Sequence, residues 1–201
     1  MSPRAYAMRR RAEQRASTRE RILSAAGSLY TERGIRATSV LEVARRADVS
    51  PGTVLNQFGT KDGLASAVLE GVASSLELPT AGIFRGARTR PERVRRLVTE
   101  LFALYDRSTA WFEVFGNEYD VVPALRVAAE GFWKQMEVLY AEALGSLIED
   151  ELVRGTVVGL SSPATLGAMR EAGLSLGQAA AVIGDLLVRA VERASRRTKR
   201  R

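Results

Sequence analysis

Apolar residues recur at helical spacing along most of the chain, and no stretch alternates apolar and polar positions long enough to predict a strand. Glycine and proline divide the chain into blocks, several of which begin with a serine or threonine cap, such as Ser17 before the first of them. Residues 77–90 read as a connection, and a loop is expected around Gly155 and Gly159. The predicted helices cover residues 18–33, 40–47, 50–58, 61–76, 91–106, 111–115, 122–149 and 163–172, and a last helix begins at Ser175.

Two of the short predicted helices are separated by a turn of only two or three residues. Residues 40–47 form the first helix, Asp48 and Val49 the turn, and residues 50–58 the second helix, which has Pro51 at its first position. This is the spacing of a helix-turn-helix, whose second helix enters the major groove of DNA while the first lies across the backbone. Short helices with short turns also occur in other α-proteins, so the spacing needs a second signal.

The distribution of charge supplies that second signal. The chain has a net charge of +7. Residues 1–21 carry seven arginines against Glu13 and Glu20, a net charge of +5, residues 189–201 carry +6, and the residues between them carry −4. Arginine-rich ends favour a polyanion, either nucleic acid or an anionic membrane surface, although a solvated tail without a partner has the same composition. Next to a helix-turn-helix, the upstream basic segment argues for DNA.

The chain contains no histidine and no cysteine. Their absence removes Ser-His-Asp and Cys-His nucleophiles, the usual zinc sites and disulfides. No apolar run is long enough to span a bilayer, and the first residues lack the apolar core of a signal peptide. We therefore expect a cytoplasmic protein that is not an enzyme and uses no metal, cofactor or membrane. A carboxylate-based enzyme is the remaining catalytic alternative, but the acidic clusters at Glu149–Glu151 and at Glu118 with Asp120 look like exposed helix ends.

Residues 18–70 resemble the N-terminal domain of the TetR family of bacterial transcriptional regulators. The features that match are, in order, an arginine-rich first helix with an Ala-Ala pair, the stop at Gly34, Thr38-Ser39-Val40, Val43-Ala44, the turn Val49-Ser50-x-Gly52-Thr53, and Phe58, Lys61 and Leu64. Each feature alone is weak, but the ordered set over about fifty residues is specific. The resemblance implies an all-α homodimer with a DNA-binding N-terminal domain and a divergent ligand-binding body.

The expected fold class is therefore all-α. A three-helix helix-turn-helix domain is followed by a larger helical bundle for ligand binding and dimerisation, with about nine helices in all. The expected domains are a basic N-terminal arm over residues 1–17, a DNA-binding domain over 18–77, a ligand-binding and dimerisation domain over 78–195, and a basic C-terminal tail over 196–201.

Carried over position by position, the resemblance places the turn and the second helix of the motif at the DNA. A missing side chain at Gly52 lets the backbone approach DNA closely. Asn56 and Gln57 each offer a donor and an acceptor, as the reading of adenine requires. Hydroxyl groups at a helix N-terminus favour phosphate. The expected DNA-binding residues are Thr38, Ser39, Arg45, Pro51, Gly52, Thr53, Leu55, Asn56, Gln57 and Lys61.

Three positions depart from the family pattern. Leu55 stands where the family usually has a tyrosine that contacts phosphate, Gln57 stands where many members have histidine, and Asp48 replaces the usual glycine of the turn. Asp tolerates the left-handed backbone conformation but brings a negative charge toward DNA. We expect the basic arm, residues 4–15, to compensate by lying along the minor groove.

The larger bundle is rich in aromatic residues on three consecutive helical segments. Most aromatic residues at helical spacing belong to a core, but together these residues have the composition of a mostly apolar pocket between helices, which the resemblance also implies. The effector, a small molecule, is not identified by the sequence. The expected pocket residues are Phe102, Tyr105, Trp111, Phe115, Trp133, Met136 and Tyr140.

The last predicted helix carries a heptad-like apolar stripe that includes three alanines. Pattern alone leaves an intrachain core and a subunit interface equally open. The resemblance favours an interface, because the last two helices of the family form a four-helix dimer contact. The expected dimer residues are Leu166, Met169, Ala180, Ile183, Leu187 and Ala190.

The function expected is that of a homodimeric repressor that binds a pseudo-palindromic operator in double-stranded DNA and is released by a small, mostly apolar ligand. It would be associated with the bacterial nucleoid when bound to DNA. The alternative is a sequence-nonspecific, nucleoid-associated DNA-binding protein that uses its arginine-rich ends.

Overall fold

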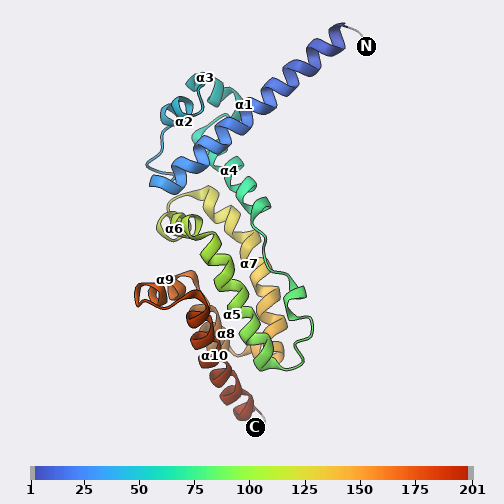
Figure 1. Ribbon diagram of the computed structural model, residues 1–201, viewed down its shortest axis with the longest axis vertical. Coiled ribbons are helices and arrows are strands. Elements are labelled where there is room, and N and C mark those ends of the chain that lie inside the picture. The colour runs from blue at the N-terminus through green and yellow to red at the C-terminus, as the bar shows by residue number, and fades with distance from the viewer. Residues whose placement is uncertain (1–2, 199–201) are drawn as a thin grey trace. The chain divides into compact units, whose positions relative to one another are not determined.

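The computed structural model describes residues 3–198, and this part of the chain consists of helices and connecting turns with no β-strand (Figure 1). The predicted all-α class is confirmed. Where about nine helices were predicted, the described residues form ten α-helices and two 3-10 helices. These are α1 (Pro3–Arg33), α2 (Val40–Arg46), α3 (Pro51–Phe58), α4 (Lys61–Ser75), η1 (Ala81–Phe84), α5 (Arg90–Arg107), α6 (Thr109–Glu118), α7 (Pro123–Leu144), η2 (Gly145–Glu149), α8 (Glu151–Leu160), α9 (Pro163–Glu171) and α10 (Leu176–Thr198).

The chain divides into two compact units. The N-terminal unit comprises the described residues up to Ser75 together with Glu113–Glu130, and the C-terminal unit comprises Leu76–Phe112 and the described residues from Gly131 onward. The sequence boundary expected at residue 77 is close to the first of these divisions. The sequence did not indicate that the end of α6 and the start of α7 group with the helix-turn-helix, because that grouping depends on contacts between distant residues.

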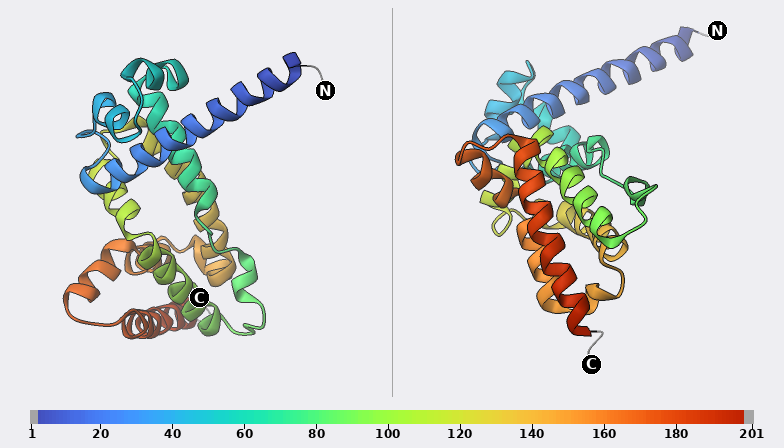
Figure 2. Two further views of the ribbon diagram at one scale, coloured as in Figure 1. Left: turned by 45° about the horizontal axis from the view of Figure 1, so that its top comes forward. Right: turned by 60° about the horizontal axis from the view of Figure 1, so that its bottom comes forward.

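In the N-terminal unit, the C-terminal half of α1 packs against α2 and α4, and α3 packs against α2 and α4. The first turns of α1 project beyond these helices (Figure 2), and residues 8–17 are exposed. The small core is made of apolar side chains that are at least 95% buried, since hydrophobic burial must hold these short helices together. They include Ile22, Ala26, Leu29, Tyr30, Ile35, Val43, Ala44, Ala47, Val54, Leu64, Ala65, Val68 and Leu69.

The first helix is longer than the sequence predicts. A cap at Ser17 was expected, yet α1 begins at Pro3 and runs without interruption to Arg33. The segment expected to be an arm is rich in Arg and Ala, which are strong helix formers, and Arg9 forms an i,i+4 ion pair with Glu13 at 2.8 Å. The basic arm is therefore the first half of a continuous helix.

In the C-terminal unit, α5 and α10 pack along each other and form the centre of the core. Leu97, Leu101 and Phe102 from α5 and Leu187 from α10 have no exposed surface. Arg95 and Asp185 add an ion pair between the same two helices at 2.9 Å, on their exposed side. The predicted basic tail begins within α10, and residues 199–201 lie outside the described residues.

Two predictions for the C-terminal unit were wrong. Residues 150–160 were expected to contain a loop, but the Asp150 carboxylate accepts hydrogen bonds from the backbone N–H groups of Leu152 and Val153 and caps α8, whose glycines face open space. The single helix expected over residues 122–149 ends at Leu144, because Gly145 takes a positive φ of +57°. A short 3-10 helix, η2, follows this break.

No helix in the described part of the chain is long and apolar enough to cross a membrane.

Candidate nucleic-acid interface

The turn between α2 and α3 is built from local capping interactions. Ser39 and Glu42 form a capping box at the start of α2, in which each side chain satisfies a backbone N–H of the other residue. Ser50 caps α3 by accepting a hydrogen bond from the backbone N–H of Thr53 at 3.2 Å. Asp48 takes the left-handed conformation expected for it, with φ 51°. The predicted helix-turn-helix is thus formed, with its second helix starting at Pro51.

One face of α3 is buried and the other is open. Val54 is 1% exposed and anchors the helix in the core. Gly52 and Asn56 are exposed, Leu55 is 43% exposed, and Thr53 and Gln57 are half-buried. Together with the exposed Pro51, these residues form a continuous surface, so the structure brings together the six candidates that the sequence placed on this helix.

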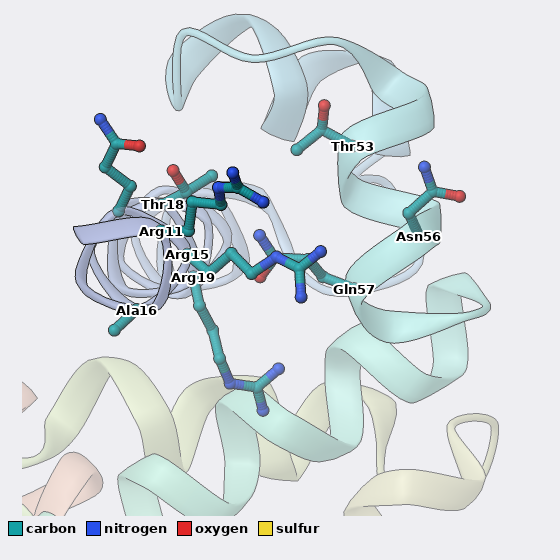
Figure 3. Close-up of a pocket in the computed structure, with 9 residues that line it drawn as sticks. Arg11, Arg15, Ala16, Thr18, Arg19, Thr53, Asn56 and Gln57 are labelled. Atoms are coloured by element: carbon teal, nitrogen blue, oxygen red, sulfur yellow. The ribbon is translucent and has the colours of Figure 1, made fainter. Parts of the chain in front are cut away.

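A groove of about 690 Å³ lies between this surface and α1 (Figure 3). In Figure 3, the side chains of Arg11 and Arg15 extend from α1 toward α3. The guanidinium of Arg19 lies over the ring of Phe58, 4.5 Å from its centroid. The groove lining contains three arginines and no acidic residue: Arg11, Gln14, Arg15, Ala16, Thr18, Arg19, Thr53, Asn56 and Gln57. The sequence indicated a basic segment but not this groove, because the prediction began the first helix only at residue 18.

Two candidates at the start of α2 are used by the fold itself. Thr38 is 1% exposed, and its hydroxyl donates to the carbonyl oxygen of Gly34 at 2.8 Å. The expectation that Thr38 offers its hydroxyl to phosphate was wrong, because this side chain closes the turn after α1. Ser39 is exposed, but its hydroxyl donates to the Glu42 carboxylate at 2.8 Å.

The two basic candidates, Arg45 and Lys61, differ from the neighbouring Arg46 in how they are held. Arg46 is paired with Glu32, and this ion pair raises the pKa of the guanidinium. Arg45 is exposed and forms no ion pair among the described residues. The ammonium of Lys61, at the start of α4, donates to the carbonyl oxygen of Arg36 at 2.9 Å, which leaves two of its three donor hydrogens for a partner.

Sequence reasoning missed the role of Glu118, which it treated as part of an exposed acidic cluster. Glu118, at the end of α6, accepts hydrogen bonds from the backbone N–H groups of Ile35 at 2.7 Å and Arg36 at 3.2 Å. It packs so closely on Gly34, where φ is +88°, that a Cβ there would lie 2.5 Å from a carboxylate oxygen. Glu118 and Lys61 therefore hold the turn between α1 and α2 from two sides. The stop at Gly34 was the only sequence signal of this arrangement.

The pocket candidates do not form one group. Phe102, Met136, Tyr105 and Tyr140 lie in the core of the C-terminal unit, and burial raises the pKa of both tyrosines. Trp133 is 45% exposed. A chain of edge-on ring contacts links the two environments, with centroid separations of 4.8 to 5.8 Å, and it runs through Tyr105, Phe112, Phe132 and Trp133.

Trp111 and Phe115 are both half-buried on α6, but they group with different units, Trp111 with the C-terminal and Phe115 with the N-terminal unit.

Most of the expected dimer residues are buried inside the chain. Leu166, Ala180, Ile183 and Leu187 are 0 to 7% exposed and belong to the core of the C-terminal unit. The apolar stripe of α10 is thus occupied by the chain's own helices, above all α5, and this corrects the expectation for these four residues. Met169 is half-buried and Ala190 is exposed. Ala190 shares the outer side of α10 with Val182 and Leu186, which are 43% and 48% exposed.

These features define an all-helical helix-turn-helix protein with a basic groove beside its second motif helix. Residues 22–68 match the family described as bacterial regulatory proteins, tetR family. The similarity to the TetR family that residues 18–70 predict is thereby confirmed.

Among curated relatives, the HTH-type transcriptional repressor Rv3405c of Mycobacterium tuberculosis is 47% identical over 55 residues, which are 27% of this chain and 29% of that protein. The chain spans the same share, 29%, of two further curated transcriptional regulators, of Mycobacterium bovis and M. tuberculosis. The ketosteroid transcriptional regulator KstR2 of M. tuberculosis has a similar fold, with a TM-score of 0.58 at 20% identity over 87% of this chain and 93% of that one. The regulator FadR of Bacillus subtilis, solved with stearoyl-CoA, gives a TM-score of 0.58 at 18% identity over 84% and 97%.

Proposed function

We propose that this chain is a DNA-binding transcriptional regulator that reads duplex DNA with α3. The observation that carries the proposal is the open surface of α3, whose Thr53, Asn56 and Gln57 line the groove together with three arginines of α1. Among the described residues, the side chains of Asn56 and Gln57 make no hydrogen bond, and the Thr53 hydroxyl contacts that of Ser50. An exposed helix with amide side chains beside a basic surface has the chemistry of a major-groove reader. The relatives named as transcriptional repressors support this proposal.

Within this proposal, residues of α3 have distinct tasks. Asn56 and Gln57 read base edges, and Leu55 offers an apolar contact of the kind made with the thymine methyl group. A Cβ at Gly52 would meet only the Ser50 hydroxyl, at 3.8 Å. The fold therefore does not require glycine at this position, which fits a need for close approach by DNA at the start of the helix. Arg45 and Lys61 contact phosphates, which position the helix without reading sequence.

We further propose that the C-terminal unit binds a small, mostly apolar effector that releases a repressor from its operator. The ring contacts that connect Tyr105 to the half-exposed Trp133 support an apolar site that begins at the surface and reaches the core. A fold neighbour, FadR, is described in complex with an acyl-CoA, which illustrates the class of ligand that such a fold accepts. The effector acts by binding better to the state that does not fit the operator.

Dimerisation is proposed through the outer side of α10. Val182, Leu186 and Ala190 recur every four residues and therefore lie along one helical face, beside the buried stripe that packs on α5. Half-exposed apolar side chains in such a row are typical of a surface that a second helix covers. A two-fold dimer presents two copies of α3, so its operator is a pseudo-palindrome.

The test of the proposal is selection from random duplex DNA with the purified chain at near-physiological salt, followed by sequencing of the retained DNA. Enrichment of an inverted repeat is the expected result. Binding without enrichment that disappears as salt rises would replace the proposal by the alternative, a sequence-nonspecific DNA-binding protein.

The dimer is tested separately by sedimentation. Leu186→Glu should shift the chain toward the monomer because it places a charge in the proposed interface. Val138→Glu on α7, where the valine is 54% exposed, serves as a control outside the proposed interface and should leave the assembly unchanged. An identical sedimentation profile for the Leu186 variant and the parent chain would show that this side of α10 is not a dimer interface.

A further inference from the structure

We propose that the groove between α1 and α3 holds one sugar–phosphate strand of the duplex, so that the N-terminal half of α1 is a second DNA-contacting element. The inference rests on the proposed function, because it assumes that α3 enters the major groove. It goes beyond the family match, which begins at residue 22, whereas Arg11, Arg15 and Arg19 precede it. It also replaces the expectation of an arm that lies in the minor groove, since these residues form a helix.

The charges in the groove favour a polyanion. Arg11, Arg15 and Arg19 line one wall, and the side chains on the other wall are neutral and polar. Arginine binds phosphate through two parallel N–H donors, which makes it suited to a phosphodiester. Glu13 lies two residues after Arg11, about 200° further around the helix, and it is paired with Arg9, so the nearby carboxylate does not neutralise the groove.

The three arginines stand on one face of α1. Their i, i+4, i+8 spacing continues the face that carries Ile22, Ala26 and Leu29 into the core of the N-terminal unit. Beyond the core, this face of α1 carries arginines in place of apolar residues, and it is still directed toward α3. The row from Arg11 to Arg19 is about 12 Å long, at a rise of about 1.5 Å per residue. This length is comparable to three to four nucleotides of one strand, at about 3.4 Å each.

Two of these three arginines, Arg11 and Arg15, make no ion pair that would stabilise the described fold. Like charges at i,i+4 on a helix repel each other. Arg11 and Arg15 are also exposed. A bound phosphate strand would remove the repulsion, and Arg19 is already held in place by its contact with Phe58. Thr53, Asn56 and Gln57 line the α3 side of the groove, so a strand held by the arginines would run past α3 and place its bases next to these side chains.

The experiment compares two double variants that remove the same charge from the same helix. Arg11→Ala with Arg15→Ala removes the two unpaired arginines of the groove. Arg10→Ala with Arg21→Ala removes two exposed arginines that do not line it. Alanine is the strongest helix former, so both variants should keep α1 folded, as circular dichroism will verify. The affinity of each for the duplex selected by the parent chain is measured at several salt concentrations.

The slope of log K against log salt distinguishes the outcomes. The groove variant should lower the slope by about 1.8, because each lost phosphate contact changes it by about 0.9, and it should weaken all duplexes to a similar extent. The control variant should keep the parent slope. If the parent chain selects an operator but both variants lower the slope equally, the groove inference is overturned while the proposed function stands. If the parent chain binds no duplex at all, the proposed function fails first and the inference fails with it.

Discussion

The candidate residues on α3 lie at the surface and most of those in the C-terminal unit are buried, although both sets were predicted from the same kind of helical pattern. The polar candidates Asn56 and Thr53 lie at an open groove. The apolar candidates Phe102 and Met136, by contrast, have no exposed surface. The difference teaches that a polar row on a short helix is informative because burying it without partners is unfavourable, whereas an aromatic row has an ordinary explanation as core.

The largest expected effect tests whether Phe102 is core, as its environment indicates. Phe102→Ala should lower the free energy of unfolding by about 3–5 kcal/mol, because it leaves a cavity in a packed interior. Trp133→Ala removes a side chain that is 45% exposed and should lower it by about 1 kcal/mol. Urea unfolding followed by circular dichroism measures both. Equal, small changes would show that Phe102 lines a cavity that already exists, and the contrast between the two regions would disappear.

A second comparison concerns glycine in the N-terminal unit. Gly34→Ala should lower the free energy of unfolding by about 1–3 kcal/mol, since the residue has a positive φ and its Cβ would meet Glu118. Gly71→Ala is the matched control, because it lies in α4 with no atom near its missing Cβ, and it should stabilise by about 0.5–1 kcal/mol. Amide hydrogen exchange of α1 and α2 would report the change locally. A neutral result at Gly34 would mean that Glu118 does not constrain this turn.

The exposed side of the comparison is tested on DNA. Thr53→Ala should weaken binding to the selected operator by about 1–3 kcal/mol, while binding to nonspecific DNA stays nearly unchanged. Lys61→Ala should weaken both and reduce the salt slope by about one. Thr53→Ser and Lys61→Arg keep the hydroxyl and the charge, and they control for the local contacts to Ser50 and Arg36. If the two alanine variants had equal effects on specific and nonspecific DNA, the assigned roles would be wrong.

The smallest effect concerns pH, where the two units should behave alike. Hydrogen bonds from Ser39 lower the pKa of Glu42 at the start of α2, and hydrogen bonds from the backbone of Thr89 and Arg88 lower that of Glu92 at the start of α5. A carboxyl whose pKa is lowered by folding stabilises the fold above its unfolded pKa, about 4.3, and this stabilisation is lost as the pH falls through the lower folded pKa.

Glu42→Gln and Glu92→Gln should each reduce the acid dependence of unfolding below that pH. Both tryptophans lie in the C-terminal unit, so fluorescence should respond to the Glu92 variant and circular dichroism to both. An acid dependence unchanged by either substitution would show that these caps are not formed in solution.

The sequence predicted the helices of the motif to within two residues because their signals are local. Caps such as Ser50 and stops such as Gly34 act on the residues beside them, and the structure has both. The predicted start of α1 failed because Ser17 imitates a cap inside a segment of strong helix formers. The loop predicted around Gly155 and Gly159 failed because the cap at Asp150 and the burial of Val153 and Val157 outweigh two glycines.

The parts of the site that could not be predicted depend on distant residues. The hydrogen bond from the backbone N–H of Ile35 to the Glu118 carboxylate joins residues 83 positions apart, and no periodic pattern records it. The apolar stripe of α10 was correctly predicted to be a packed face. The pattern alone could not decide whether Ile183 packs against a second chain or against α5. In the structure, Ile183 lies in the chain's own core. The groove could not be predicted without knowing that α1 extends back to Pro3 and carries Arg11 and Arg15 beside α3.

The central claim is that α3 lies in the major groove with α1 beside the flanking backbone. The chain has no cysteine, so Asn56→Cys, Gln14→Cys and Ser66→Cys each provide one attachment point for a DNA-cleaving iron chelate. On the selected operator, the account predicts cuts within the half-site from position 56, cuts at its flanking backbone from position 14, and little cutting from position 66 on α4. Cuts from position 56 that are no stronger than those from position 66 would contradict it.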